Sequence, residues 1–412
     1  PGNPFVNAGE NITLVCENTT ILEADFSRIG LTDNYSVRPI NFVPPFPFEG
    51  LLNQLDSDQD DIWIDPEPFP TDSDGQLFDF CFFTDSIDEF QLGSNGNINL
   101  YDPRPAYLEL NDYDLEGATL PNNVKNPLKD SHVLTPFHDI DTTPFTGDDI
   151  EVGWEFIGEY PNRVLAISYS NVPMWGCPGQ FATHMVVFYE TTNIIDIYIE
   201  SAPPCAAWNN NKIVGIQNDD GTVAVVPLDP VTGESRNNTG LWDTQNEAWR
   251  FSPIGDNIVS FEWFDSDGNF ISSEEELEVT VYETETFTAR ASFTTCSDAT
   301  TVIEDTVTVF IDEDPPFDVD LGDDLFYCLG DPPATLVADI NSPTATYSWT
   351  LNGATIAGQS GPNLPVIYTG TYVAIVNDGS CTIEDEIYVE FSNEDSSFTL
   401  TPTCDGATAN IT

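Results

Sequence analysis

The chain has 412 residues, of which 40% are hydrophobic and 12% aromatic, and its 70 acidic against 10 basic residues give a formal net charge of −60. This length suits about two to four domains, and the apolar content excludes a disordered acidic polymer. The scarcity of Lys and Arg excludes nucleic acids as partners, because the phosphates would be repelled. No run approaches the roughly 18 apolar residues of a membrane span, so membrane insertion is not expected. The charge favours solubility in a salty medium, bound divalent cations, or both.

The elements predicted along the chain are almost all β-strands. The chain opens on PGNPFVNAG, which has the composition of a linker and lacks the features of a signal peptide. Alternating runs rich in Val, Ile, Thr, Tyr and Phe then recur at 163–172, 184–200, 306–312 and 369–378. Gly, Pro, Asn and Asp interrupt these runs, and no segment has the periodicity of a helix longer than a turn or two. The sequence therefore predicts an all-β chain built of β-sandwiches.

Two phrases far apart in the sequence repeat each other. VCENTTILEADF at 15–26 matches the pattern of YCLGDPPATLVADI at 327–340. The second copy continues into Trp349, a further cysteine and an Ile-Glu-Asp triplet, which is the layout of an Ig-like or PKD-like sandwich. The same sequel to the first copy begins only near Trp263. A long segment therefore interrupts the first copy.

We predict that the first Ig-like domain is split by an insertion, since surface loops tolerate folded inserts whose ends lie close together. The last segment of the chain begins like a further repeat. The predicted division is a split Ig-like domain at 1–26 plus 257–313, an inserted large β-sandwich module at 27–256, a second Ig-like domain at 314–392, and the first strands of a truncated third repeat at 393–412.

The insert carries three distinctive motifs. They are an SNG strand at 94–96, a Phe-x-Asp-x-Asp stretch at 137–141 and an R-x-x-x-x-x-Y-x-x-V strand at 163–172. Through these motifs the insert resembles the extracellular nidogen-like module. Over the stretches 78–100, 134–175, 182–222 and 238–251 it resembles the β-sandwich module of large surface adhesins that gliding Bacteroidota export through the type 9 secretion system. The resemblance implies an extracellular position at the cell surface, a role in adhesion or gliding motility, and no catalytic residues.

The same resemblance implies the partners. They are surface glycans or polysaccharide, neighbouring repeats of the same chain, and outer-membrane secretion and attachment machinery reached through regions outside this chain. Two other functions fit the sequence: a structural stalk or filament segment without a ligand, and a carbohydrate-binding module of a secreted polysaccharide-degrading protein. Catalysis is not expected, because His132, His138 and His184 lack metalloprotease spacing and no G-x-S-x-G or phosphate-binding loop occurs.

Eight cysteines in a Lys-poor chain indicate an oxidising, extracellular compartment and predict disulfides. The repeat layout supplies two pairs, and a hairpin-like strand pair supplies a third. The predicted bonds are Cys16–Cys296, Cys328–Cys381 and Cys177–Cys205. Cys81 alternates with Phe on a buried strand and is expected to be a free thiol, although it is also a rival partner for Cys16. Cys404 has no predicted partner.

Loops with carboxylates at alternate positions suit Ca²⁺, which prefers oxygen ligands. The predicted ligands are Asp56, Asp58, Asp60, Asp61, Asp139, Asp141, Asp265 and Asp267. Solvated turns are the alternative for the loops at 56–61 and 265–269, and a hydrogen-bonded turn is the alternative for 138–141. No loop completes an EF-hand, because the final Glu is missing. Ca²⁺ is the one cofactor expected.

Trp208 follows a cysteine and precedes a run of asparagines, and an aromatic ring beside amide groups is typical of sugar recognition. The predicted ligand-binding residues are therefore Trp208, Asn209 and Asn210, with a place in the core as the alternative for the ring. Asp-Ser and Asp-Thr triplets resemble the O-glycosylation signal of exported Bacteroidota proteins. They predict modification at Ser86, Thr142 and Thr306.

Overall fold

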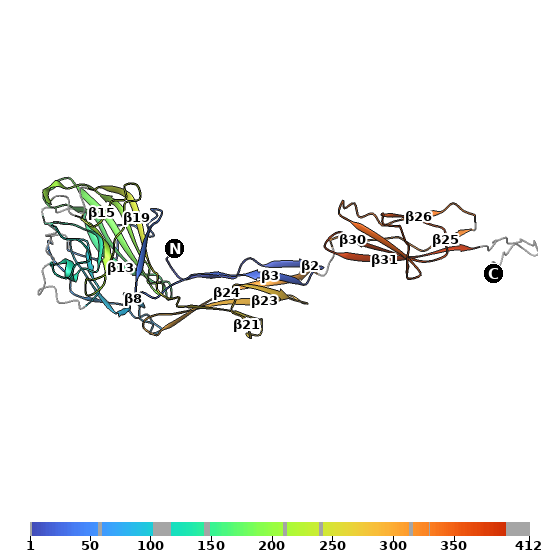
Figure 1. Ribbon diagram of the computed structural model, residues 1–412, viewed down its shortest axis with the longest axis horizontal. Helices are drawn as coiled ribbons and strands as arrows, with labels where there is room; N and C mark the ends of the chain where they lie inside the picture. The colour runs from blue at the N-terminus through green and yellow to red at the C-terminus, as the bar shows by residue number, and fades with distance from the viewer. Residues whose placement is uncertain are drawn as a thin grey trace, which may run out of the picture. The chain divides into compact units, whose positions relative to one another are not determined.

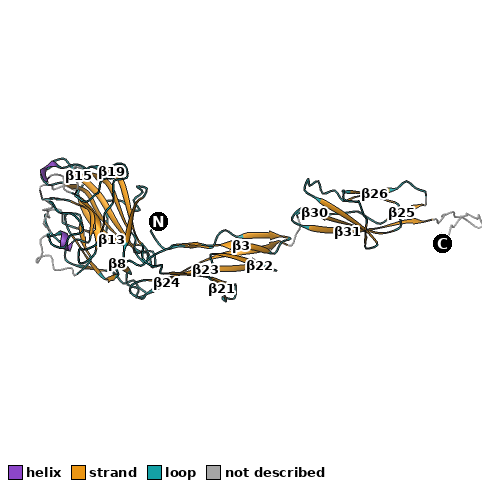
Figure 2. Ribbon diagram, in the orientation of Figure 1, coloured by secondary structure: helices purple, strands orange, loops and turns teal. Residues whose placement is uncertain are grey.

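The computed structural model describes residues 2–56, 60–101, 117–143, 149–208, 212–238, 242–312, 316–328 and 330–392. Strands dominate these residues, as Figure 2 shows in orange, and the helices among them are the two short 3-10 helices η2 (Leu128–Asp130) and η3 (Ala206–Trp208). The predicted fold class, all-β with tandem β-sandwiches, is confirmed. No helix in the described ranges is long and apolar enough to cross a membrane.

The chain folds as two compact units. One comprises Pro1–Ala8, Ala24–Glu275 and Thr288–Thr306, and the other comprises Gly9–Glu23, Glu276–Phe287 and Val307–Thr412. The first unit contains the large module. The second contains the second repeat, and strands of the first repeat contribute to both units.

Two sheets form the large module. The seven-stranded sheet has, in spatial order, β5 (Tyr35–Pro39), β19 (Thr244–Pro253), β16 (Ile195–Ala202), β15 (Phe181–Tyr189), β14 (Val164–Pro173), β13 (Glu151–Ile157) and β6 (Asn53–Gln54). The six-stranded sheet has β18 (Ala224–Val225), β17 (Ile213–Gln217), β12 (Val133–Phe137), β11 (Asn97–Asn99), β10 (Glu89–Leu92) and β7 (Glu67–Pro68). A separate hairpin pairs β8 (Phe80–Phe82) with β9 (Asp85–Ile87).

The central strands of the seven-stranded sheet are buried on both faces. Leu165, Ile167 and Tyr169 of β14 point into the core between the two sheets. Val164 belongs to the opposite face, which the apolar side chains of the Pro-rich segment 40–48 cover. Because both faces are covered, these strands form nearly continuous apolar runs, where a sheet with one wet face would alternate.

The first repeat is formed by the two parts of the chain that precede and follow the module in the sequence. Its sheets are β2 (Ile12–Val15), β24 (Thr300–Asp312), β23 (Glu285–Thr294), β20 (Val259–Phe264) and β21 (Phe270–Ser272), with the pairs β22 (Glu276–Thr280)–β3 (Thr19–Glu23) and β1 (Val6–Asn7)–β4 (Asp25–Phe26). Figure 1 shows blue β2 and β3 beside gold β23 and β24. The backbone N–H of Ile258 donates to the carbonyl of Ile29 (3.0 Å), so the two ends of the interrupting segment meet. The predicted domain boundaries stay a prediction.

The second repeat has the same arrangement in one continuous segment. Its sheets are β25 (Leu325–Cys328), β31 (Thr382–Ser392), β30 (Gly370–Asn377), β27 (Thr346–Leu351) and β28 (Ala354–Thr355), with the pair β26 (Ala334–Val337)–β29 (Asn363–Val366). In each repeat an edge strand near the start, β2 or β25, runs parallel to the last long strand, β24 or β31. Trp263 and Trp349, which marked the repeats in the sequence, are both fully buried.

The disulfides differ from the prediction in two of the three pairs. The structure contains the bonds Cys16–Cys381, Cys81–Cys296 and Cys177–Cys205, and Cys328 is free and exposed. The predicted Cys177–Cys205 bond is therefore present. The predicted bonds Cys16–Cys296 and Cys328–Cys381 are wrong, and so is the free thiol at Cys81.

Strand register explains the correction. β2 runs parallel to β24 and ends opposite Asp312, so Cys16 lies by the end of β24. Cys296 precedes the start of that strand, whose 13 residues span about 40 Å. The 11 residues of β31, about 35 Å, separate Cys328 from Cys381 in the same way. A disulfide requires Cα atoms within about 7 Å, so neither pair can bond within its own repeat.

Candidate functional site

Two of the predicted acidic segments meet in the module. Carboxylate oxygens of Asp60, Asp61 and Asp139 lie within 4.8 Å of one another, and all three residues are partly buried. Asp60 and Asp61 lie between β6 and β7, whereas Asp139 follows β12. A β-bridge between Asp60 and Asp141 holds the two segments side by side. The sequence predicted each segment separately, but their meeting depends on the packing of the sandwich.

Asn95 holds this acidic cluster together. Its fully buried side chain donates from Nδ2 to Asp61 Oδ1 (2.9 Å), while its Oδ1 accepts a hydrogen bond from the backbone N–H of Ile140 (2.8 Å). The next residue, Gly96, has a φ of 85°, and a Cβ atom there would lie 2.3 Å from the carbonyl oxygen of Pro136. The SNG and Phe-x-Asp-x-Asp motifs, which carried the resemblance, therefore pack against each other beside these carboxylates.

The acidic cluster has the electrostatics of a cation site. Burial, and then the charges of Asp61 and Asp141, raise the pKa of Asp60 to about 6. The Oδ1 atom of Asp60 is buried and accepts no hydrogen bond from the described residues. Ca²⁺ takes about six to eight oxygen ligands, with carboxylates foremost among them. These carboxylates therefore fit Ca²⁺, with water supplying the ligands that they do not.

The other predicted metal ligands lie elsewhere. Asp56 is exposed, and Asp58 lies outside the described residues. The turn between β20 and β21 contains Asp265, whose Oδ1 accepts hydrogen bonds from the backbone N–H groups of Asp267 (3.0 Å) and Asn269 (2.8 Å). The side chain of Asn269, together with these backbone bonds, lowers the pKa of Asp265. Asp265 and Asp267 therefore lie in an exposed turn away from the acidic cluster, and their role as metal ligands stays a prediction.

The histidines are buried in the module and lie outside the acidic cluster of the described residues. Burial lowers the pKa of His132 and of His138 to about 3, and it also lowers the pKa of His184. The ring centroids of His138 and His184 are 5.8 Å apart, and Thr135 Oγ1 lies 3.1 Å from His184 Nδ1. All three imidazoles are therefore neutral core groups at neutral pH.

A polar groove of about 380 Å³ lies at the ends of β15, β16 and β19. It is lined by Gly179, Gln180, Phe181, Ser201, Pro203, Pro204, Asp243, Thr244 and Gln245. Amide, hydroxyl and carboxylate groups beside an aromatic ring can donate to and accept from sugar hydroxyls. The Cys177–Cys205 bond joins the segments that flank this groove. Trp208 follows Cys205 in η3, whereas Asn209 and Asn210 lie outside the described residues.

A buried lysine supports the wall of this groove. Lys212 Nζ donates hydrogen bonds to the carbonyls of Pro203 (2.7 Å) and Ala202 (3.3 Å), and it lies 4.6 Å from the ring centroid of Trp242. Burial lowers the pKa of Lys212 to about 7. Sequence reasoning missed this residue. Its one signal is rarity, since the chain has only 10 basic residues.

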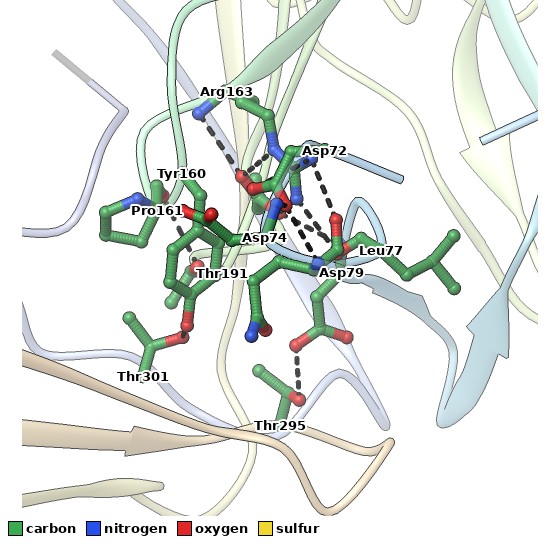
Figure 3. Close-up of polar contacts among 12 residues, drawn as sticks. Asp72, Asp74, Leu77, Asp79, Tyr160, Pro161, Arg163, Thr191, Thr295 and Thr301 are labelled. Carbon is green, nitrogen blue, oxygen red and sulfur yellow. Dashed lines mark hydrogen bonds and ion pairs between the residues drawn. The ribbon is translucent and has the colours of Figure 1, made fainter. Parts of the chain in front are cut away.

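A buried ion pair in the module holds the segment that precedes β8. Arg163, the first residue of the R-x-x-x-x-x-Y-x-x-V motif, pairs with Glu190, and their side chains are 6% and 0% exposed. Arg163 also donates to the backbone carbonyls of Gln76 (3.1 Å) and Leu77 (2.9 Å). Arg163 and Leu77 are labelled in Figure 3. Glu190 accepts a hydrogen bond from the backbone N–H of Asp79 (3.1 Å). The pair therefore fixes the segment that leads into β8.

This segment fastens the module to the first repeat. The carboxylate of Asp79 accepts a hydrogen bond from Thr295 Oγ1 (2.6 Å, Figure 3). It accepts a second one from Ser297 Oγ (2.9 Å), and both donors lie in the turn between β23 and β24. Cys81 in β8 forms its disulfide with Cys296 of the same turn. The Cys81–Cys296 disulfide and the side-chain hydrogen bonds of Asp79 therefore join the module to the first repeat at the same turn. We call this group of residues, Asp79, Cys81, Thr295, Cys296 and Ser297, the locked junction.

The predicted glycosylation sites differ in accessibility. Ser86 in β9 and Thr306 in β24 are exposed, and their modification stays a prediction. Thr142 is only 4% exposed, so its modification in the folded chain is excluded, because the transferring enzyme cannot reach a buried hydroxyl.

Residues 76–253 match the family model described as NIDO related. No curated protein matches the chain. Among solved structures, an I-band fragment of titin is 14% identical, over 32% of this chain and 55% of that chain, with a TM-score of 0.20. Extracellular domains 3–5 of Drosophila OTK are 9% identical, over 60% of this chain and 98% of that chain, with a TM-score of 0.19. The N-terminal four Ig domains of Dscam1 isoform 6.9 are 13% identical, over 94% and 99%, with a TM-score of 0.16.

The matched residues cover most of the module, including the SNG strand and the Phe-x-Asp-x-Asp stretch. Disulfides persist in oxidising compartments, so the three bonds are typical of an extracellular protein. Residues 76–253 are therefore similar to a NIDO-related domain, and they lie in a chain of β-sandwiches whose disulfides are typical of an extracellular protein.

Proposed function

We propose that this chain is an extracellular segment of a large cell-surface adhesin, in which the NIDO-related module binds a glycan and the Ig-like repeats act as spacers. The parent protein would be of the kind that gliding Bacteroidota export through the type 9 secretion system, and the support is the resemblance of the stretches 78–100, 134–175, 182–222 and 238–251. The observation that carries the proposal is the polar groove at the ends of β15, β16 and β19. Its lining offers amides, hydroxyls, a carboxylate and an aromatic ring.

Two features keep the groove in a binding-competent shape. The Cys177–Cys205 bond ties together the segments beside it, and Lys212 holds the carbonyl of Pro203 in its wall. A preformed site loses less conformational freedom on binding than a flexible one. The locked junction fastens the same module to the first repeat, so a load on a bound glycan would pass into the repeats through a covalent bond.

We expect glycan-array binding of the full chain to weaken in the variants Phe181→Ala and Gln245→Ala. Each removes one groove contact, the ring or an exposed amide, and the loss of one such contact weakens binding about tenfold. The matched control is Gln359→Ala, which removes an exposed amide from the second repeat and should leave binding unchanged. Equal binding by all of these variants would place the glycan elsewhere on the chain.

A structural stalk without a ligand is the second candidate function. The Cys16–Cys381 bond favours it, because a covalent link between two repeats serves mechanical continuity and needs no ligand. The array separates the two functions. A chain that binds no glycan, either with or without Ca²⁺, would leave only the stalk.

We further propose that Asp60, Asp61 and Asp139 bind Ca²⁺, with Asp141 adding negative charge beside them. The support is the 4.8 Å grouping of the carboxylates and the buried Oδ1 atom of Asp60 without a hydrogen-bond partner among the described residues. Two β-bridged segments would be joined by the ion. Ca²⁺ would thus stabilise the rim of the module between β12 and the segment before β7.

Ca²⁺ is expected to raise the melting temperature of the full chain at about pH 7.5, because an ion bound only to the native state stabilises it by about 2.7 kcal/mol at a hundred times Kd. The shift should shrink at about pH 5, since the pKa of Asp60 is raised from 3.8 to about 6 and its protonated form is a poor ligand. Without Ca²⁺ the contribution of Asp60 to stability depends on pH in the opposite direction. The raised pKa means that this group's contribution to stability falls as pH rises from about 4 to about 6.

Calorimetry with matched variants tests the Ca²⁺ site. Asp60→Asn should abolish the shift, whereas Asp74→Asn, which removes an exposed carboxylate of another loop, should keep it. NaCl at the same ionic strength controls for simple screening of the net charge. If NaCl reproduces the whole effect, the acidic residues serve solubility alone.

A further inference from the structure

The cysteines of the two repeats occupy two equivalent positions. Cys16 follows β2 and Cys328 ends β25, and each of these strands runs parallel to the last long strand of its own repeat. Cys296 and Cys381 lie instead in the turn that precedes that last strand, β24 or β31. We call the first pair strand-end cysteines and the second pair turn cysteines.

Each turn cysteine is bonded to the part of the chain that packs before its own repeat. Cys296 of the first repeat is bonded to Cys81 of the module, and Cys381 of the second repeat is bonded to Cys16 of the first. No described cysteine bonds to its counterpart in the same repeat, because the length of β24 or β31 separates them. The direction of pairing is therefore the same at both turns.

Cys328 is the strand-end cysteine left over by this rule, and it is free and exposed. Exposure does not set it apart from its bonded counterpart, since Cys16 is also exposed although it is in a disulfide. A tight turn keeps Cys328 at the end of its strand. Its backbone N–H donates to Asp331 Oδ2 (2.9 Å), and its carbonyl accepts from the N–H of Asp331 (3.0 Å).

We propose that Cys328 forms a disulfide with the turn cysteine of an Ig-like repeat of the same kind that packs after the second repeat. The partner is a sandwich with a cysteine in the turn before its last long strand, the position that Cys381 occupies here. The two thiols lose two protons and two electrons, which a disulfide-bearing thiol oxidoreductase of the extracellular compartment takes up as it is reduced to its dithiol. The Cys16–Cys381 bond is thus one disulfide between successive repeats, and Cys328 would form the next such disulfide.

The test inserts a second copy of residues 314–392 after Ser392 of the full chain. Cys328 pairs in register with Ser392, and Cys16 follows the residue paired with Asp312, so the inserted copy reproduces the spacing seen at Cys16. In the inserted copy, Thr382→Ser marks the Cys381 peptide by mass and Tyr327→Phe marks the Cys328 peptide, so the unmarked Cys328 peptide is that of the first copy. The oxidised protein is then alkylated with iodoacetamide, digested without reduction and mapped by mass spectrometry.

In the present chain Cys328 should be fully alkylated. In the extended chain we expect Cys328 of the first copy to lose its alkylation and appear linked to the marked Cys381 peptide. Cys381→Ser in the inserted copy alone should restore alkylation of that Cys328. The Cys16–Cys381 bond, mapped in the same digest, reports that the original repeat has folded. Continued alkylation of first-copy Cys328 beside an intact Cys16–Cys381 bond, or its linkage to any other cysteine, would overturn the proposal.

Discussion

Replacing Arg163 with Met is expected to lower the free energy of unfolding of the module by about 3–5 kcal/mol, because Glu190 then remains as an uncompensated charge at a fully buried position. The carbonyls of Gln76 and Leu77 lose their donors as well. Urea unfolding followed by tryptophan fluorescence measures the change. A midpoint shift without a change in slope would assign it to stability alone.

Arg28→Met is the matched control for this change. Arg28 also forms an ion pair, with Glu275, and its guanidinium also lies over a phenylalanine ring, Phe26, as that of Arg163 lies over Phe78. The Arg28 pair is 58% and 47% exposed, so its loss should lower stability by less than about 1 kcal/mol. Equal losses for the two variants would show that burial of the Arg163 pair contributes nothing to the module.

The second large effect is expected on removal of the Cys81–Cys296 bond. This bond closes a sequence separation of 215 residues, and in the chain-entropy model such a loop is worth about 5 kcal/mol of stability. The double variant Cys81→Ala/Cys296→Ala should therefore melt well below the parent chain in calorimetry. It should also loosen the attachment of the turn between β23 and β24 to the module, which the side-chain bonds of Asp79 would then hold without a covalent link.

Cys177→Ala/Cys205→Ala serves as the comparison. Its separation of 28 residues predicts a smaller loss, about 3–4 kcal/mol in the same model. A melting temperature unchanged by removal of Cys81–Cys296 would mean that the locked junction is not a structural element.

The sequence predicted the fold class correctly because strand periodicity and turn residues act locally. The repeat could be recognised in the sequence because each copy has a tryptophan, Trp263 or Trp349, that is fully buried in its core. The central strands of the seven-stranded sheet do not alternate strictly between apolar and polar residues, and the reason lies outside those strands. The segment 40–48 covers the second face of the seven-stranded sheet. The sequence of a strand does not predict which of its faces a distant loop will cover.

The disulfide pairs could not be read from the repeat layout alone. In Ig-like domains the two cysteines face each other across the core, and that layout suggested Cys16–Cys296. Here the strand-end cysteine follows an edge strand that runs parallel to the last strand, which puts it at the opposite end from the turn cysteine. Sequence equivalence located the positions, whereas the register of β2 against β24 decided their partners.

The candidate sites were predicted in part. The acidic residues were identified at Asp60, Asp61 and Asp139, but their grouping required Asn95 to link two segments that are distant in sequence. Arg163 was part of a motif without an assigned role. Its pairing with Glu190 became evident only when both were found on adjacent buried positions of the module, where each charge needs the other.

Peptide mapping of the oxidised full chain without reduction tests the central claim most directly, namely that the module and the repeats are covalently linked to one another. The account predicts linked peptides containing Cys81 with Cys296 and Cys16 with Cys381, and an alkylated Cys328. Linked peptides containing Cys16 with Cys296, and Cys328 with Cys381, would contradict it, because each repeat would then close on itself and the locked junction would lose its covalent bond.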